Sequence, residues 1–336
     1  MSGKLVLNVA KNLLFLIAGI AMLFLAFRGK DLQELIADIR QAKISWIVFS
    51  MILGFAAFVS RAIRWKILLE PMGYKPKVTS SVYSIIIGYL ANLAIPRIGE
   101  LTRCTVMSKT EDIPVDKLFG TVILERVIDL LILVFLTVLV VLLKVETFGN
   151  FFMNLIRDNA ASYPKIALLL GIACVGFVLL LISLYILRAR FTLHPWSIKI
   201  RSFFLGLKEG LVSVKNIKNM KGFVFHTFLI WFFYYVMTWI VFYAFEETSG
   251  LSMVDGLFIL VVGGFGMAAP VQGGIGAYHL IVSMGMGVLG IDQTIGLSFA
   301  TVLHTSQTFL VLALGVLSLI LVYLQNRNNA SNQLIT

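Results

Sequence analysis

Charged residues and glycines gather in one stretch of the sequence, residues 88–129. An apolar segment runs into Pro96, and the seven residues 97–103 then hold three charges and a glycine. Further on, apolar sequence carries three more charged residues, which are Glu125, Arg126 and Asp129. Charged side chains inside a membrane are costly and usually face a protein interior or a wet cavity. In a membrane protein, this stretch would therefore be the first candidate for a functional site.

The composition is that of a polytopic membrane protein. The chain has 336 residues, 59% hydrophobic and 13% charged, and its mean hydropathy is +0.93. Lipid admits only helices or closed barrels, and the long apolar runs predict helices. The net charge of +11 fits basic cytoplasmic loops rather than a nucleic-acid surface. With two cysteines and four histidines, we expect no metal site and no cofactor.

The apolar runs predict an all-α protein with about six full spans and two broken re-entrant hairpins, or eight spans if the hairpins cross. We expect one membrane domain, 1–336, with halves 1–165 and 166–336, and a retained first helix rather than a signal peptide. A short interfacial helix is expected within 28–43. The expected spans are 13–27, 44–63, 119–143, 166–187, 223–245 and the last within 294–324.

Loop charge predicts the topology. The loops 61–77 and 188–221 are basic and are expected in the cytoplasm, whereas the acidic patch 246–255 is expected outside. Counting crossings then requires two hairpins. Residues 78–112 enter the membrane from the cytoplasm and return to it, and residues 256–290 enter from outside and return there. Both termini are predicted to be cytoplasmic, in a multi-pass protein of the cell (inner) membrane.

The two breaks share a weak repeat. Residues 94–99 parallel 268–273, and 121–123 parallel 301–303. Opposite entry sides and a repeated break are typical of inverted-repeat transporters, whose sites lie where broken helices meet. A helix that restarts after Pro96 or Pro270 would direct unpaired N–H groups at an anion. Four glycines would let a headgroup approach the backbone, namely Gly99, Gly273, Gly274 and Gly276.

Charged side chains near the first break supply the remaining candidates. Arg97, Arg103 and Arg126 add positive charge. Spacing allows Glu100 to pair with Arg97 or Arg103, and Asp129 to pair with Arg126. The apolar run 130–143 has 14 residues, fewer than the roughly 17 that a span needs, so Asp129 is drawn into the bilayer. Both substrate contact and a purely structural salt bridge stay open.

Three further groups are weighed against ordinary packing. Arg61 and Arg64 share one helical face, which fits either interfacial anchoring or contact with a lipid phosphate. His279 follows the second break, and His304 lies inside the last apolar run. Each histidine fits a cavity group or a packed, hydrogen-bonded side chain.

As an ordered set, these motifs resemble the membrane domain of the lysylphosphatidylglycerol synthase/flippase family over nearly the whole chain. The elements are Arg61-x-x-Arg64-Trp65, Asn92-x-x-x-Pro96-Arg97-x-Gly99-Glu100-x-x-Arg103, Glu125-Arg126-x-x-Asp129 and Pro270-x-x-Gly273-Gly274-x-Gly276. The resemblance implies handling of anionic lipids, with links to polyprenyl-linked glycans. Many relatives separate the proline from the arginine, and many carry an arginine near His304, where this chain has none. Thr336 lies about a dozen residues past the last span, so we expect no soluble aminoacyl-transferase domain.

The leading hypothesis is a lipid flippase, a transporter rather than an enzyme. It would move a phosphate-bearing (anionic or aminoacylated) headgroup, either passively or ion-coupled, since the chain has no G-x-x-x-x-G-K-[ST] motif. The alternatives are a membrane enzyme or accessory protein of polyprenyl-phosphate metabolism, with Glu100 and Glu125 as acid and base, and a scaffold acting through the loop 188–221. The expected partners are membrane lipids, with a homodimer and partner enzymes left open.

Overall fold

The computed structural model describes residues 3–146 and 217–333. Residues 1–140 and 216–336 form one compact unit and residues 141–215 a second. The predicted span 166–187 and most of the basic loop 188–221 lie outside the described residues.

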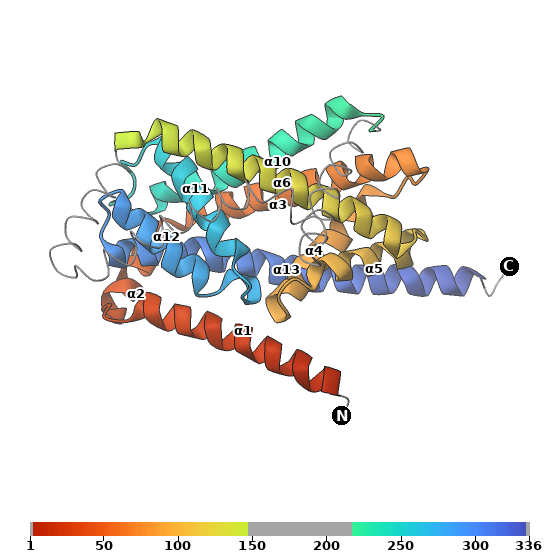
Figure 1. Ribbon diagram of the computed structural model, residues 1–336, viewed down its shortest axis with the longest axis horizontal. Helices are drawn as coiled ribbons and strands as arrows, with labels where there is room; N and C mark the ends of the chain where they lie inside the picture. Colours follow the sequence, from red (N-terminus) through yellow and green to blue (C-terminus); the bar gives the residue numbers. More distant parts are fainter. Residues whose placement is uncertain (1–2, 147–216, 334–336) are drawn as a thin grey trace, which may run out of the picture. The chain divides into compact units, whose positions relative to one another are not determined.

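The described part is all-helical, as the apolar runs predict (Figure 1). Four of its helices are long and apolar enough to cross a membrane, which makes the chain an integral membrane protein. These segments are Ile44–Met72, Val115–Leu143, Met220–Ala244 and Gln293–Gln325. The cell membrane and the orientation of the termini stay predictions.

A long helix and a short one open the chain. Helix α1 (Gly3–Phe27) packs against the second broken hairpin. Helix α2 (Leu32–Gln41) begins at Asp31, whose carboxylate accepts a bond from the backbone of Gln33 at 2.8 Å. Leu35 of α2 is buried against Leu297 of the last helix. The expected short amphipathic helix therefore exists, and it packs on the protein.

The first half continues with a long helix, a broken hairpin and a second long helix. These are α3 (Ile44–Leu69), followed by the short 3-10 turn η1 (Glu70–Met72), then α4 (Val78–Ala94), α5 (Gly99–Glu111) and α6 (Val115–Leu143). Ile95 is extended, at φ −135° and ψ 124°, as steric contact with the following Pro96 requires. The expected break therefore falls at Pro96, and the return segment is the helix α5.

The second half repeats this order. It runs α10 (Met220–Ile240) with the 3-10 turn η4 (Val241–Ala244), then α11 (Met253–Ala268), the turn η5 (Gln272–Gly274), α12 (Ala277–Val288) and α13 (Gln293–Gln333). A reciprocal capping box between Ser252 and Asp255 starts α11. Gly273, Gly274 and Gly276 have positive φ, so the second break also falls where the sequence predicts it.

The two halves meet along several helices. Helix α3 packs over much of its length on α10, and α13 packs on α4 and α12 (Figure 1). The two breaks also touch, because α4 contacts η5 and the Arg97 guanidinium donates to the Ala268 carbonyl at 3.5 Å. Broken helices therefore meet within the protein, as in the repeat architecture that the sequence suggests.

Candidate functional site

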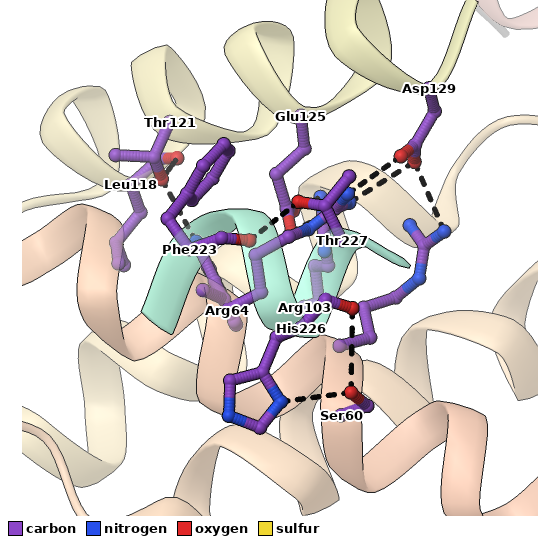
Figure 2. Close-up of polar contacts among 12 residues, drawn as sticks. Ser60, Arg64, Arg103, Leu118, Thr121, Glu125, Asp129, Phe223, His226 and Thr227 are labelled. Atoms are coloured by element: carbon purple, nitrogen blue, oxygen red, sulfur yellow. Dashed lines mark hydrogen bonds and ion pairs between the residues drawn. The ribbon is translucent and has the colours of Figure 1, made fainter. Parts of the chain in front are cut away.

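Helices α3 and α6 face each other through charged side chains. Arg61 and Arg64 lie three residues apart on α3, and Glu125 and Asp129 lie four apart on α6, so each pair shares a helical face. The Arg64 guanidinium donates to both Asp129 oxygens, at 2.8 and 3.2 Å, and to Glu125 at 3.4 Å. Arg61 donates to Asp129 at 3.0 Å. Figure 2 shows Arg64 reaching from α3 to both carboxylates of α6.

Helix α5 adds a third arginine to this group. Arg103 donates to the second oxygen of Glu125 at 2.7 Å. Its guanidinium also lies 4.8 Å from the ring centre of Trp65, at the distance of a cation–π contact. The Trp65 indole N–H donates to the Thr121 hydroxyl at 2.8 Å, which fixes the ring between α3 and α6. We call these five ionic residues the ion network: Arg61, Arg64, Arg103, Glu125 and Asp129.

The ion network is almost dry. The side chains of Arg64 and Glu125 have no solvent exposure, and that of Asp129 is 13% exposed. Desolvating a charge is expensive, so such groups persist only where ion pairs and hydrogen bonds compensate. Three positive charges face two negative ones here, which leaves a net charge of +1. An uncompensated buried positive charge favours an anion nearby.

A small pocket opens beside the ion network. It is lined from α3 and α4 by Arg61, Ile85, Gly88, Tyr89 and Asn92, and from α5 and α6 by Gly99, Glu100, Arg103 and Arg126. The buried Nε atoms of Arg61 and Arg103 have no hydrogen-bond partner. The pocket has space for about one water molecule, so this conformation is closed to a lipid headgroup.

An ion pair between Glu100 and Arg126 lies at this pocket. The Arg126 side chain is 48% exposed and that of Glu100 is 21% exposed, so the pair is less buried than the ion network. One Glu100 oxygen accepts from Arg126, and the other is buried without a partner. Exposed pairs contribute little to stability. This contact is therefore the weakest ionic link around the pocket.

The first break supplies a more modest anion site than the sequence suggests. The amide of Gly99, the first residue of α5, donates to the Asn92 side chain at 2.7 Å. That N–H is thus already satisfied within the hairpin. Pro96 lies in the break between α4 and α5. The next residue, Arg97, has a left-handed backbone conformation at φ 63°, and its guanidinium donates to the Ala268 carbonyl. Arg97 consequently lies outside the pocket lining.

The second break is lined by aromatic and imidazole side chains instead of ion pairs. The imidazole Nε2 of His304 lies 2.8 Å from the Gly273 carbonyl oxygen, and its ring centre lies 4.9 Å from that of His279. Tyr278 packs on His304 at 5.1 Å. A side chain at Gly276 would collide with the Gly19 backbone, so this glycine serves the close approach of α1. Pro270, Gly274 and both histidines lie outside the pocket of the first half.

The sequence profile described as "Lysylphosphatidylglycerol synthase TM region" matches residues 11–315, nearly the whole chain. The chain belongs to this family. The match confirms the resemblance drawn from the ordered motifs at both breaks.

Two similar proteins are archaeal UPF0104 membrane proteins. One, from Methanocaldococcus jannaschii, is 20% identical over 315 residues, covering 88% of this chain and 94% of the relative. The other, from Methanothermobacter thermautotrophicus, is 22% identical over 300 residues, covering 83% and 86%. Glycosyltransferase AglD of Haloferax volcanii is 26% identical over 125 residues, 37% of this chain and 20% of that protein. No solved structure matches.

Within this family member, the local pairings expected from spacing are wrong. Glu100 pairs with Arg126 of α6 instead of Arg97 or Arg103, and Asp129 is bonded to Arg61 and Arg64 of α3 instead of Arg126. Spacing along one helix identifies neighbours on that helix, but a carboxylate near the bilayer interior takes whichever arginine the facing helix presents.

The interpretation of Arg61 and Arg64 as interfacial anchors is also wrong. Helix α3 continues to Leu69, so both arginines lie inside it and are buried. Sequence reasoning gave no role to Thr121 or Tyr89. The only signal for Thr121 was its place in the repeated triplet 121–123. The candidate residues of the first half, except Pro96 and Arg97, thus come together in the ion network and the pocket, whereas those of the second half lie outside both.

The described residues contain no group of three or more histidine, cysteine, aspartate or glutamate side chains that could hold a metal ion. The expectation of no cofactor stays a prediction.

Proposed function

We propose that this chain is a lipid flippase or facilitator that moves a phosphate-bearing lipid headgroup through the membrane. The observation that carries the proposal is the buried ion network, whose net charge of +1 lies beside a pocket lined by Arg61, Arg103 and Arg126. Guanidinium groups match phosphate oxygens in geometry and charge. Family membership supports a lipid-handling role.

A closed pocket fits one of the conformations through which an alternating-access transporter cycles. A headgroup needs far more room than about one water molecule, so transport requires that the pocket widen. The ion network ties α3, α5 and α6 together, and the Glu100–Arg126 pair is the link that is easiest to open. Passive movement needs nothing further from the chain.

The test is headgroup translocation by the purified full chain in proteoliposomes. Fluorescent anionic and zwitterionic lipids are presented in one leaflet, and their loss from it is followed by dithionite quenching. We expect wild type to move an anionic lipid, and Arg126→Gln to reduce the rate to that of protein-free vesicles. Lys109→Gln removes an exposed positive charge from α5 outside the pocket and should leave the rate unchanged.

Either of two results would end this proposal. One is the absence of movement for every lipid tested with folded wild-type protein. The other is movement that Arg126→Gln leaves at the wild-type rate. Folding of each variant is checked by size-exclusion chromatography and helical circular dichroism.

A membrane enzyme of polyprenyl-phosphate lipids is the second candidate, favoured by the partial match to a glycosyltransferase. That match covers 20% of the glycosyltransferase. Glu125 is also poorly suited to acid–base chemistry, because hydrogen bonds from Arg64 and Arg103 occupy its two oxygens. Formation of product from a lipid-linked sugar by the purified chain would favour the enzyme.

A further inference from the structure

Two of the arginines that line the pocket carry donors without a hydrogen-bond partner among the described residues. The Nε atoms of Arg61 and Arg103 are buried and unpaired, on side chains that are at most 6% exposed. Both residues line the pocket. Buried guanidinium donors without acceptors are unfavourable. An acceptor that enters the pocket would therefore gain from both arginines.

Glu100 supplies an anion at the same place. One of its oxygens accepts from Arg126, while the other is buried without a donor. The carboxylate thus neutralises Arg126 but satisfies neither Arg61 nor Arg103. A tetrahedral phosphate has enough oxygens for all three guanidinium groups, whereas this carboxylate reaches one.

We propose that the pocket is a phosphate site in which Glu100 stands in for the phosphate on Arg126, and that its ligand is a lipid ending in a phosphate monoester. This inference rests on the proposed function and names its substrate class. With Glu100 in place there is room for about one water molecule. A phosphate therefore enters only when Glu100 leaves.

Charge then selects the ligand. Departure of Glu100 adds the free charge of Arg126 to the net +1 of the ion network, so two positive charges face the pocket. A phosphate monoester carries about −1.5 to −2 at neutral pH and balances both. A phosphodiester carries a single negative charge and leaves one guanidinium without a counter-charge.

The experiment measures binding instead of transport. Purified full-length protein in nanodiscs is titrated with a labelled short-chain phosphatidic acid, which is a phosphate monoester, and with the matching phosphatidylglycerol, a diester. We expect wild type to bind the monoester about tenfold more tightly, the factor associated with one charged hydrogen bond. Arg126→Gln should remove this preference.

Glu100→Gln gives the sharper prediction. It deletes the internal anion, so binding of the monoester should become tighter than in wild type. Glu111→Gln removes a carboxylate from the same helix outside the pocket and should change nothing. Equal binding of the two lipids by wild type, or weaker monoester binding by Glu100→Gln, would overturn the inference.

Two further measurements, a competition with inorganic phosphate and a translocation assay, distinguish the remaining possibilities. If unlabelled inorganic phosphate displaces the lipid at a concentration similar to that of unlabelled phosphatidic acid, the ligand is free phosphate and the lipid part of the inference fails. If displacement needs a much higher concentration of inorganic phosphate, the lipid assignment stands. Translocation is scored separately. If the protein moves a diester and shows no preference for the monoester, the flippase proposal stands and this inference is refuted. If it binds the monoester but translocates no lipid, only the flippase proposal is refuted.

Discussion

Neutralising Glu125 should destabilise the protein severely. The side chain has no solvent exposure and accepts from Arg103 at 2.7 Å and from Arg64 at 3.4 Å. Glu125→Gln keeps the shape but leaves three guanidinium groups facing the single carboxylate of Asp129. Removing one partner from a buried ion pair typically lowers the free energy of unfolding by about 3–5 kcal/mol. We expect a loss of that size.

The measurement is denaturation of the purified protein in a fixed detergent, followed by helical circular dichroism and tryptophan fluorescence. Glu100→Gln is the matched control, because it makes the same chemical change in a partly exposed pair. Exposed pairs contribute about 0–1 kcal/mol, so the control should lose no more than that. If Glu125→Gln loses as little as Glu100→Gln, the ion network is not desolvated and the reasoning is refuted.

A double variant tests whether charge balance is the cause. Arg103→Met with Glu125→Met removes one charge of each sign, so the network keeps its net +1. Replacing a buried pair by apolar side chains of similar volume is often nearly neutral. The double variant should therefore be more stable than Glu125→Gln. A double variant that loses the sum of the two single losses would show that the residues do not interact.

Two smaller predictions concern the framework of the pocket. Gly99→Ala places a methyl group against the α4 backbone and Asn92, so it should prevent close packing of the hairpin and lower the melting temperature, whereas Gly120→Ala, which meets nothing within 4 Å, should not. Trp65→Phe removes the indole N–H that donates to Thr121, and we expect a loss of about 1 kcal/mol by the same denaturation assay.

Much of the fold could be predicted from local sequence. The lengths of apolar runs indicate the spans, and Pro96 and the glycines at 273 and 274 mark the two breaks, because their effect on the backbone is local. The short run after Asp129 likewise predicts that this carboxylate is drawn into the bilayer. These inferences need no knowledge of which helices are neighbours.

The partners of the charges could not be predicted in this way. A prediction of ion pairs between helices requires the relative rotation of α3, α5 and α6, which depends on packing over their whole length. The end of α3 was misplaced for the same reason. Taken alone, Arg61 and Arg64 suggest the membrane interface. Because α6 supplies Glu125 and Asp129 as partners, α3 can continue with both arginines buried.

The two halves repeat their helix order but differ in chemistry, and this difference constrains how the pocket can open. The first half holds the ion network, while the second break carries His279, His304 and Tyr278. Separating buried ion pairs is expensive, so a rearrangement that opens the pocket should keep α3, α5 and α6 joined. It should instead break the Glu100–Arg126 pair and the long bond from Arg97 to Ala268 between the halves. Both are less buried than the ion network, so they cost less to break.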